Sequence, residues 1–227
     1  MGMEWYDQIA LRNGGYKSNA ICTVEGISAE DIFEQRLIQM LPACESVLDA
    51  GCGHGEFTLK MSPYAKRLTG FDNSANLLAI AHGLWEEAGV SHVRFVYATT
   101  KTELPFQDGE FDLIYDRRGP TSIIDHPRVL CPGGIIFGIH NRVDAVQERL
   151  TRNRYTDIEM EEYDEAVTYY PNRTEFTKAL SSIPGNPDYT LPEHQQELEE
   201  RISEHNIGGR LGIREHKFIW KARKPFV

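Results

Sequence analysis

The apolar positions between residues 28 and 140 follow two spacings, one typical of helices and one of buried strands. Residues 28–41 begin with a serine and early acids, carry apolar side chains at helical spacing and are followed by Pro42, so they predict a helix. Helical patterns recur up to about Tyr64 and over 74–88. Short apolar runs predict strands at 46–50, 67–71, 92–97, 111–115 and 134–139. Strands that alternate with helices predict an α/β domain with a doubly wound, mostly parallel sheet.

The pattern changes after residue 141, where more polar segments replace this alternation. Residues 143–154, 172–182 and 193–206 are expected to be helical, and the proline- and glycine-containing stretch 183–192 to be a loop. The run 155–170 is ambiguous and is expected to end in a strand. The alternating tail 215–223 predicts a final strand.

Composition is consistent with one soluble domain. Of the 227 residues, 41% are hydrophobic and 26% are charged, which are ordinary values for a protein with an apolar core. No stretch approaches the roughly 20 apolar residues that span a bilayer, and the N-terminus lacks the features of a secretion signal. Four scattered cysteines without a Cys-x-x-Cys pair predict neither a disulfide framework nor a metal site. We therefore expect a cytoplasmic protein with no membrane partner.

The net charge of −10 bears on the partner. Proteins that follow a phosphate backbone bind it through Lys and Arg and usually carry a basic face. An acidic chain can still contain a basic groove, so the charge disfavours a nucleic-acid partner without excluding one. It favours a small-molecule substrate.

The most informative segment is 47–55, where a predicted strand runs into three glycines at alternate positions, Gly51, Gly53 and Gly55. Glycine lets a backbone turn tightly and approach a ligand, and such loops lie where open α/β sheets bind ligands. The dinucleotide fingerprint Gly-x-Gly-x-x-Gly places its third glycine one residue later. Position 56 is a glutamate, which would oppose a pyrophosphate at the helix N-terminus. Spacing and charge thus argue against NAD, although three glycines alone also fit a structural turn.

Asp72 ends the next predicted strand. A carboxylate at this position can accept hydrogen bonds from both hydroxyls of an adenosine ribose. The alternative is that Asp72 caps the helix over 74–88, a role that Asn73 or Ser74 could also fill.

Four segments, taken together, resemble the class I S-adenosylmethionine-dependent methyltransferases: 49–55, 70–74, 104–112 and 128–134. The resemblance covers roughly residues 30–140. It implies a Rossmann-like sheet of seven strands whose last strand is antiparallel, with S-adenosyl-L-methionine lying across the carboxyl ends of the first four strands. The expected organisation is a single domain, 1–227, made of an N-terminal helical cap (1–44), a cofactor-binding core (45–141), a substrate-side lid insertion after the fifth strand (142–210) and the final strand (211–227).

The resemblance also assigns cofactor contacts by position. It assigns Asp49 and the backbone of Gly51, Cys52 and Gly53 to the methionine end, Asp72 to the ribose, Asn73 and Leu77 to the adenine, and Asp116 to the same site. Many relatives have an Asp just after the third strand, where this chain has Thr99 and Thr100. Because a hydroxyl accepts hydrogen bonds more weakly than a carboxylate, we expect weaker contacts to adenine than to ribose.

The chemistry of methyl transfer makes a general base optional. The reaction is an in-line displacement that depends mainly on holding the acceptor at attack distance. Neither the Asn-Pro-Pro-Tyr motif of amino-group methylators nor a Pro-Cys nucleophile follows the fourth predicted strand. His140, at the end of the fifth, is the candidate catalytic base; the alternative is a hydrogen-bonded scaffold residue.

Arg117 and Arg118 follow the fourth predicted strand, at the edge where the family binds substrate. They could clamp a carboxylate or a phosphate through planar, bidentate guanidinium groups. The alternative is that they pair with local acids such as Asp116 and Asp125.

Aromatic residues flank the core on both sides and could form a lid over a small acceptor. They are Trp5, Tyr6 and Tyr16 before the first helix and Tyr163, Tyr169 and Tyr170 after the fifth strand. Tyr16 and Tyr170 are the two candidate substrate contacts. The alternative is that these aromatics only pack the lid onto the core.

The leading hypothesis is methyl transfer to a small-molecule acceptor, anionic or aromatic, in a monomer or a homodimer. A methyltransferase acting on an RNA base or on a protein is the second hypothesis, disfavoured by the acidity. A catalytically silent scaffold that binds the cofactor is the third, and the intact Asp49, Gly51, Gly53 and Asp72 argue against it.

Overall fold

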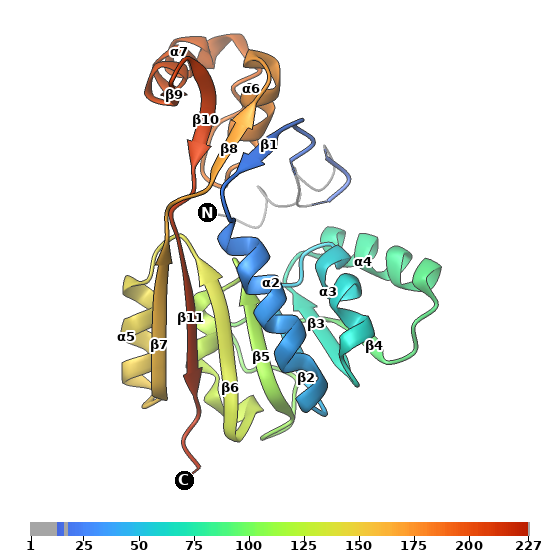
Figure 1. Ribbon diagram of the computed structural model, residues 1–227. Helices are drawn as coiled ribbons and strands as arrows, with labels where there is room; N and C mark the ends of the chain where they lie inside the picture. The colour runs from blue at the N-terminus through green and yellow to red at the C-terminus, as the bar shows by residue number, and fades with distance from the viewer. Residues whose placement is uncertain (1–12, 16–17, 227) are drawn as a thin grey trace. The chain divides into compact units, whose positions relative to one another are not determined.

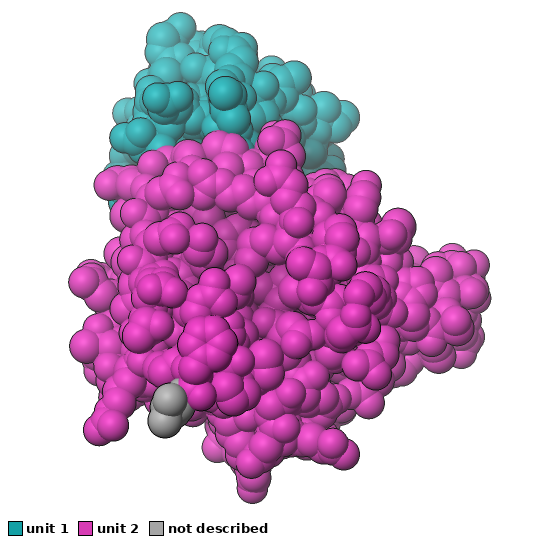
Figure 2. Space-filling view, turned by 60° about the horizontal axis from the view of Figure 1, so that its bottom comes forward, with its two compact units in different colours: residues 1–28, 164–216 teal, residues 29–163, 217–227 magenta. Residues whose placement is uncertain are grey.

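The computed structural model describes residues 13–15 and 18–226 of the chain. They divide into two compact units, which Figure 2 shows in different colours. Unit 1 contains the described residues of Met1–Ser28 together with Asp164–His216, and unit 2 contains those of Ala29–Tyr163 and Lys217–Val227. The methyltransferase-like segments all lie in unit 2.

Unit 2 is built on a seven-stranded sheet with the order β4-β3-β2-β5-β6-β11-β7 (Figure 1). Its strands are β2 (Val47–Ala50), β3 (Leu68–Asp72), β4 (Val93–Tyr97), β5 (Phe111–Arg117), β6 (Leu130–His140), β7 (Thr156–Tyr163) and β11 (Lys217–Arg223). The strands β2 to β6 pair in parallel, whereas β11 is antiparallel to both β6 and β7. The expected seven-stranded, mostly parallel sheet with an antiparallel last strand is confirmed.

Helices cover both faces of this sheet, and the apolar side chains of its central strands are buried on both. The helices are α2 (Ala29–Met40), α3 (Glu56–Met61), α4 (Ala75–Ala88) and α5 (Asp144–Arg152), with short 3-10 helices η1 (Leu41–Ala43), η2 (Ser62–Tyr64), η3 (Thr121–Asp125) and η4 (Pro127–Val129). In one core cluster the rings of Phe33 and Phe137 stack with centroids 4.6 Å apart. The other contains Ile114, Leu150 and Trp220. Burial on both faces explains why these strands have unbroken apolar runs.

Unit 1 contains a four-stranded antiparallel sheet with the order β1-β8-β10-β9. Its elements are β1 (Thr23–Glu25), β8 (Val167–Tyr170), α6 (Arg173–Ser181), η5 (Pro192–His194), α7 (Gln195–Glu204), β9 (Asn206–Ile207) and β10 (Arg210–Arg214). Its core is formed by Phe176, Leu180, Tyr189 and Leu198. None of the helices among the described residues of either unit is long and apolar enough to cross a membrane.

The segment after the fifth core strand is arranged differently from the expected insertion at 142–210. The ambiguous run 155–170 contains two strands, and only β8 belongs to unit 1, because β7 pairs with β11 of the large sheet. Ion pairs such as Glu159–Lys221 support that pairing. Residues 211–214 likewise belong to β10 of unit 1, so the strand that completes the large sheet begins at Lys217.

The carboxyl edge of the large sheet, where the parallel strands end, positions the candidate site. β11 begins at this edge, because Phe218 pairs with His140 at the end of β6 and Lys217 pairs with Tyr163 at the end of β7. The chain therefore leaves unit 2 and re-enters it at the edge where the sequence places the candidate site residues.

Candidate cofactor and acceptor site

The glycine loop, residues 51–55, connects β2 to α3 through backbone that favours glycine. Gly51, Gly53 and Gly55 have φ values of +78°, +56° and +81°, a region that other residues rarely adopt. The backbone N–H groups of Gly51 and Cys52 both donate to the Phe71 carbonyl at 2.9 Å. A Cβ on Gly51 would lie 2.6 Å from Pro120 Cδ. The loop is thus fixed to β3 and packed against the turn that follows β5.

Asp72 ends β3 and joins two segments of the site. Its Oδ2 accepts a hydrogen bond from the Gly53 N–H and its Oδ1 one from the Ser74 N–H, both at 2.9 Å. The cap of α4 is Ser74, whose hydroxyl accepts from the Leu77 N–H at 3.2 Å. Asn73 beside it is exposed and Leu77 is buried. The side chain that caps α4 is therefore not that of Asp72.

Asp49 lies beneath the loop as a buried carboxyl group. Only 3% of the residue is exposed, and its Oδ2 accepts a hydrogen bond from the Thr58 hydroxyl at 2.6 Å. Burial raises the pKa of Asp49 to about 7, although the Thr58 hydrogen bond and the charge of Arg117 lower it. The neighbouring Tyr115 is also buried, which raises its pKa well above the usual value. Asp49 thus titrates close to neutral pH.

Thr99 and Thr100 follow β4 and are tied to η3. The hydroxyls of Thr100 and Ser122 lie 2.6 Å apart, and His126 Nε2 lies 3.0 Å from the Thr100 carbonyl oxygen. Ser122 and His126 were not predicted as site residues, because no motif or spacing in the sequence relates them to Thr100. The structure joins these two loops at the carboxyl edge.

The turn after β5 is fixed by Asp116, which is fully buried. Its Oδ1 accepts a hydrogen bond from the Gly119 N–H at 2.6 Å. The turn places Arg118 at φ +60°, a conformation that costs a non-glycine residue energy and occurs where surrounding contacts enforce it. A Cβ on Gly119 would lie 2.1 Å from the Ala50 carbonyl oxygen. The turn therefore packs directly against the end of β2.

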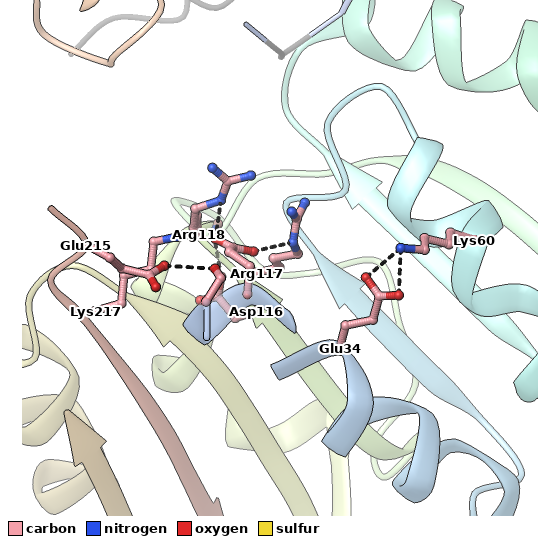
Figure 3. A network of polar contacts seen from close by, with 10 residues as sticks. Glu34, Lys60, Asp116, Arg117, Arg118, Glu215 and Lys217 are labelled. Carbon is pink, nitrogen blue, oxygen red and sulfur yellow. Dashed lines mark hydrogen bonds and ion pairs between the residues drawn. The ribbon is translucent and has the colours of Figure 1, made fainter. Parts of the chain in front are cut away.

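Both arginines pair with an acid, as the alternative interpretation held, but the acid is Glu30 in the first turn of α2 and not Asp116 or Asp125. Arg117 Nε lies 2.7 Å from Glu30 Oε2, and Arg118 Nε lies 3.2 Å from Oε1. Lys217 Nζ lies 2.9 Å from the same Oε1. Figure 3 shows both arginines at the end of β5 and Lys217 at the start of β11.

The Glu30 carboxylate is held ionised by these three cations. Burial raises its pKa, but Arg118, Arg117 and Lys217 outweigh burial and lower it to about 2. Asp125 is engaged elsewhere, with Arg149 and Arg152. Because Glu30 is 87 residues from Arg117, the sequence offered no local sign of the pair.

His140 is 9% exposed, and both of its ring nitrogens have protein contacts. Nδ1 accepts a hydrogen bond from the Trp220 indole N–H at 3.0 Å, which places the ring proton on Nε2. Nε2 lies 3.3 Å from the Gly119 carbonyl oxygen and 3.4 Å from Asp116 Oδ2. Burial lowers the pKa of His140, but Asp116 and the Gly119 carbonyl raise it to above its usual value. His140 thus connects β11 to the turn after β5.

Of the two tyrosines that are candidate substrate contacts, the structure describes only Tyr170. Tyr16 lies outside the described residues, as do Trp5 and Tyr6. Tyr170 belongs to unit 1, where its ring meets Phe176 edge-on at 5.5 Å and burial raises its pKa to about 12. A substrate contact for either tyrosine stays a prediction.

Comparison of the sequence with known proteins identifies a domain within unit 2. Residues 47–133 match the family described as "Methyltransferase domain". The uncharacterized methyltransferase YcgJ of Bacillus subtilis (strain 168) is 40% identical over 68 residues, which are 30% of this chain and 26% of YcgJ. The match thus spans about a quarter of the length of that relative.

Solved structures share the fold over most of the chain. A functionally unknown protein from Deinococcus radiodurans R1 has a TM-score of 0.70 at 24% identity, covering 97% of this chain and 99% of that one. The structure of YcgJ has a TM-score of 0.66 at 18% identity, with coverages of 86% and 99%. The N-methyltransferase NodS of Bradyrhizobium japonicum WM9, in complex with S-adenosyl-L-homocysteine, has a TM-score of 0.52 at 17% identity, with coverages of 86% and 87%.

The matched domain contains the glycine loop, Asp72 and the turn after β5, and the sheet has the seven strands and the antiparallel last strand that the sequence resemblance implied. Residues 47–133 therefore match a methyltransferase domain, and the chain shares the fold of the solved structures to which it is similar.

Proposed function

We propose that this protein transfers a methyl group from S-adenosylmethionine to a small-molecule acceptor. The observation that carries the proposal is the position of Asp72 beside the glycine loop at the carboxyl edge. Each carboxylate oxygen can accept more than one hydrogen bond, so the backbone bonds to Gly53 and Ser74 are compatible with hydrogen bonds from ribose hydroxyls. Because Ser74 caps α4, the helix does not depend on the Asp72 side chain as its cap.

The residues present fit the cofactor. Gly51, Gly53 and Gly55 carry positive φ values, so the loop turns tightly at the carboxyl edge, where open α/β sheets bind ligands. In this assignment the backbone of Gly51–Gly53, with Asp49 and Asp116 behind it, holds the methionine end, and Asn73, Leu77, Thr99 and Thr100 hold the adenine. When bound, S-adenosylmethionine supplies a methyl group on a sulfonium.

The protein's own contribution is to place the acceptor. Arg117 and Arg118 lie at the end of β5, next to the glycine loop, and are the substrate contacts that we favour; Tyr16 and Tyr170 remain further candidates. We infer that His140 positions the turn rather than moving a proton, because its ring nitrogens contact Trp220, Asp116 and Gly119. A base is dispensable when the acceptor atom carries no proton.

Calorimetry on the full chain with S-adenosylmethionine, S-adenosylhomocysteine and NAD tests the cofactor. We expect the first two to bind and NAD not to bind. Binding of NAD alone would overturn the proposal.

Incubation with methyl-labelled cofactor and fractionated metabolite pools tests the transfer. We expect label to enter small molecules. Cofactor binding without turnover on any pool would favour the silent scaffold, and label in RNA or protein would favour a macromolecular acceptor.

A further inference from the structure

Three cationic side chains of unit 2 converge on one carboxylate at the carboxyl edge. Arg117, Arg118 and Lys217 all contact Glu30, which is 18% exposed. Glu30 also lies in the first turn of α2, where the helix N-terminus adds positive potential. In a chain with a net charge of −10, this is a local concentration of positive charge.

The two arginines differ in what else holds them. Arg117 is 28% exposed and its guanidinium carbon lies 4.3 Å from the centroid of the Phe57 ring. Arg118 is 42% exposed. Within the part of the chain that the structure describes, Glu30 is the one carboxylate within ion-pair distance of either guanidinium, and both arginines approach it through Nε. Most of the guanidinium fork of Arg118 is therefore available to a second oxyanion.

The backbone around Arg118 is built to present this side chain. Asp116 bonds the Gly119 N–H at 2.6 Å and Arg118 adopts φ +60°, while the next two residues of the turn pack against Gly51 of the glycine loop. A strained conformation persists where the surroundings enforce it and often marks a functional site. The backbone turn that carries Arg118 is thus held against the loop assigned to the cofactor.

We propose that Arg118 binds an oxyanion, a carboxylate or a phosphate, carried by the methyl acceptor, with Glu30 as the resident counter-ion of the site. Planar bidentate pairing is the geometry by which arginine recognises both groups. Glu30 orients the cations in the absence of acceptor and competes with the acceptor for them. The inference rests on the proposed function and adds the charge of the acceptor to it.

The test uses inorganic phosphate and malonate as probes, titrated by NMR into the full chain saturated with S-adenosylhomocysteine at constant ionic strength. We expect at least one probe to bind, with Arg118→Gln weakening it tenfold or more and Glu30→Gln strengthening it threefold or more. Arg94→Gln is the matched control, because Arg94 lies on β4, is 56% exposed and also pairs with an acid, Glu110. This substitution should change the affinity less than twofold. Binding of phosphate alone indicates a phosphorylated acceptor, and binding of malonate alone a carboxylate.

The outcomes that overturn the inference are distinct from those that overturn the proposed function. Failure of both probes to bind overturns the inference, as does an equal loss of affinity in Arg118→Gln and Glu30→Gln, which indicates a general disturbance of the turn. Arg118→Gln could also weaken S-adenosylhomocysteine binding as much as it weakens binding of the probes. That result would assign the arginine to the cofactor and would also overturn the inference. Failure of the unmodified chain to bind S-adenosylhomocysteine contradicts the proposed function, whatever the probes show.

Discussion

The carboxyl edge of the sheet has two sides of different construction. The cofactor side, the glycine loop 51–55 with Asp72, is made from consecutive elements and held mainly by backbone hydrogen bonds. The arginine side brings together Glu30, Arg117 and Lys217, which come from α2, β5 and β11, through side-chain ion pairs.

This difference in construction suits the two sides to different roles. Backbone contacts and glycines create a shape that does not depend on long side chains. Ion pairs between distant segments can change with a single substitution while the sheet is kept. We infer that the glycine loop and Asp72 serve the proposed cofactor, and that the arginine side selects the proposed acceptor.

Gly51 packs against Gly119 and Pro120 of the turn after β5, and Gly51→Ala should have the largest effect on stability. Alanine would carry a left-handed φ, at roughly 1–2 kcal/mol, and its Cβ would overlap Pro120, which adds an overpacking cost. We expect the free energy of unfolding, measured in urea, to fall by about 2–4 kcal/mol.

Gly89→Ala is the matched control for this substitution. Gly89 also has a positive φ, +63°, but a Cβ there would meet no atom within 4 Å, so only the backbone cost of about 1–2 kcal/mol applies. Equal losses in the two variants would show that the glycine loop does not depend on close packing against the turn after β5.

Asp72→Ala probes the cofactor side. We expect S-adenosylhomocysteine binding to weaken by about 1.5–3 kcal/mol, the scale for hydrogen bonds to a charged group. Asp112→Ala is the control. Asp112 lies on β5 and also accepts two backbone hydrogen bonds, from the N–H groups of Glu45 and Ser46. If calorimetry gives an unchanged dissociation constant for S-adenosylhomocysteine, or an equal loss of affinity in both variants, Asp72 has only a structural role.

The two sides also differ in how far the sequence predicts them. The glycine loop and Asp72 lie within 22 residues (51–72), and their positions follow from the ends of two adjacent parallel strands. The apolar runs likewise predicted the strands of the core and its overall topology. The glycine loop, Asp72 and the core strands could be predicted because local sequence patterns determine their backbone geometry.

The arginine side could not be predicted because its contacts join distant segments. Asp125 is close to Arg118 in sequence, yet it pairs with Arg149 and Arg152, while the true partner Glu30 resembles an ordinary acid at a helix start. The run 155–170 ends in a strand, β8, as expected, but its first strand was missed for a similar reason: the polar β7 is stabilised by pairing with β11, more than 50 residues later. Neither partner is visible in the local pattern.

Trp220→Phe tests how His140 supports the arginine side. The indole N–H can bond only to an unprotonated Nδ1, so its removal should raise the pKa of His140 further and lower stability by about 1–2 kcal/mol at a pH above that pKa. A histidine whose pKa is raised in the folded protein stabilises the fold when the pH is below its pKa in the unfolded chain, about 6.5. This stabilisation is lost as the pH rises through the pKa in the folded protein. The deficit of the variant should therefore shrink in acid.

The measurements are an NMR titration of the His140 imidazole and urea unfolding at several pH values. Trp85→Phe is the control, because its indole donates to the Val90 carbonyl oxygen at 2.7 Å and should leave His140 unchanged. A His140 pKa that is the same in the Trp220 variant and the unmodified chain would contradict the proposed link.

Asp49→Asn should have the smallest effect, seen only as a change with pH. With a pKa of about 7, native Asp49 keeps a proton that the unfolded chain has released above about pH 4. This contribution to stability is present in acid and is lost as the pH rises through 7, by about 1 kcal/mol between pH 6 and 8. Asparagine is neutral throughout and can still accept from Thr58, so the variant should lack this loss. If urea unfolding gives the same difference in stability between the two proteins at pH 6 and pH 8, Asp49 does not titrate near neutrality, and the buried carboxyl beneath the glycine loop is ionised across this range.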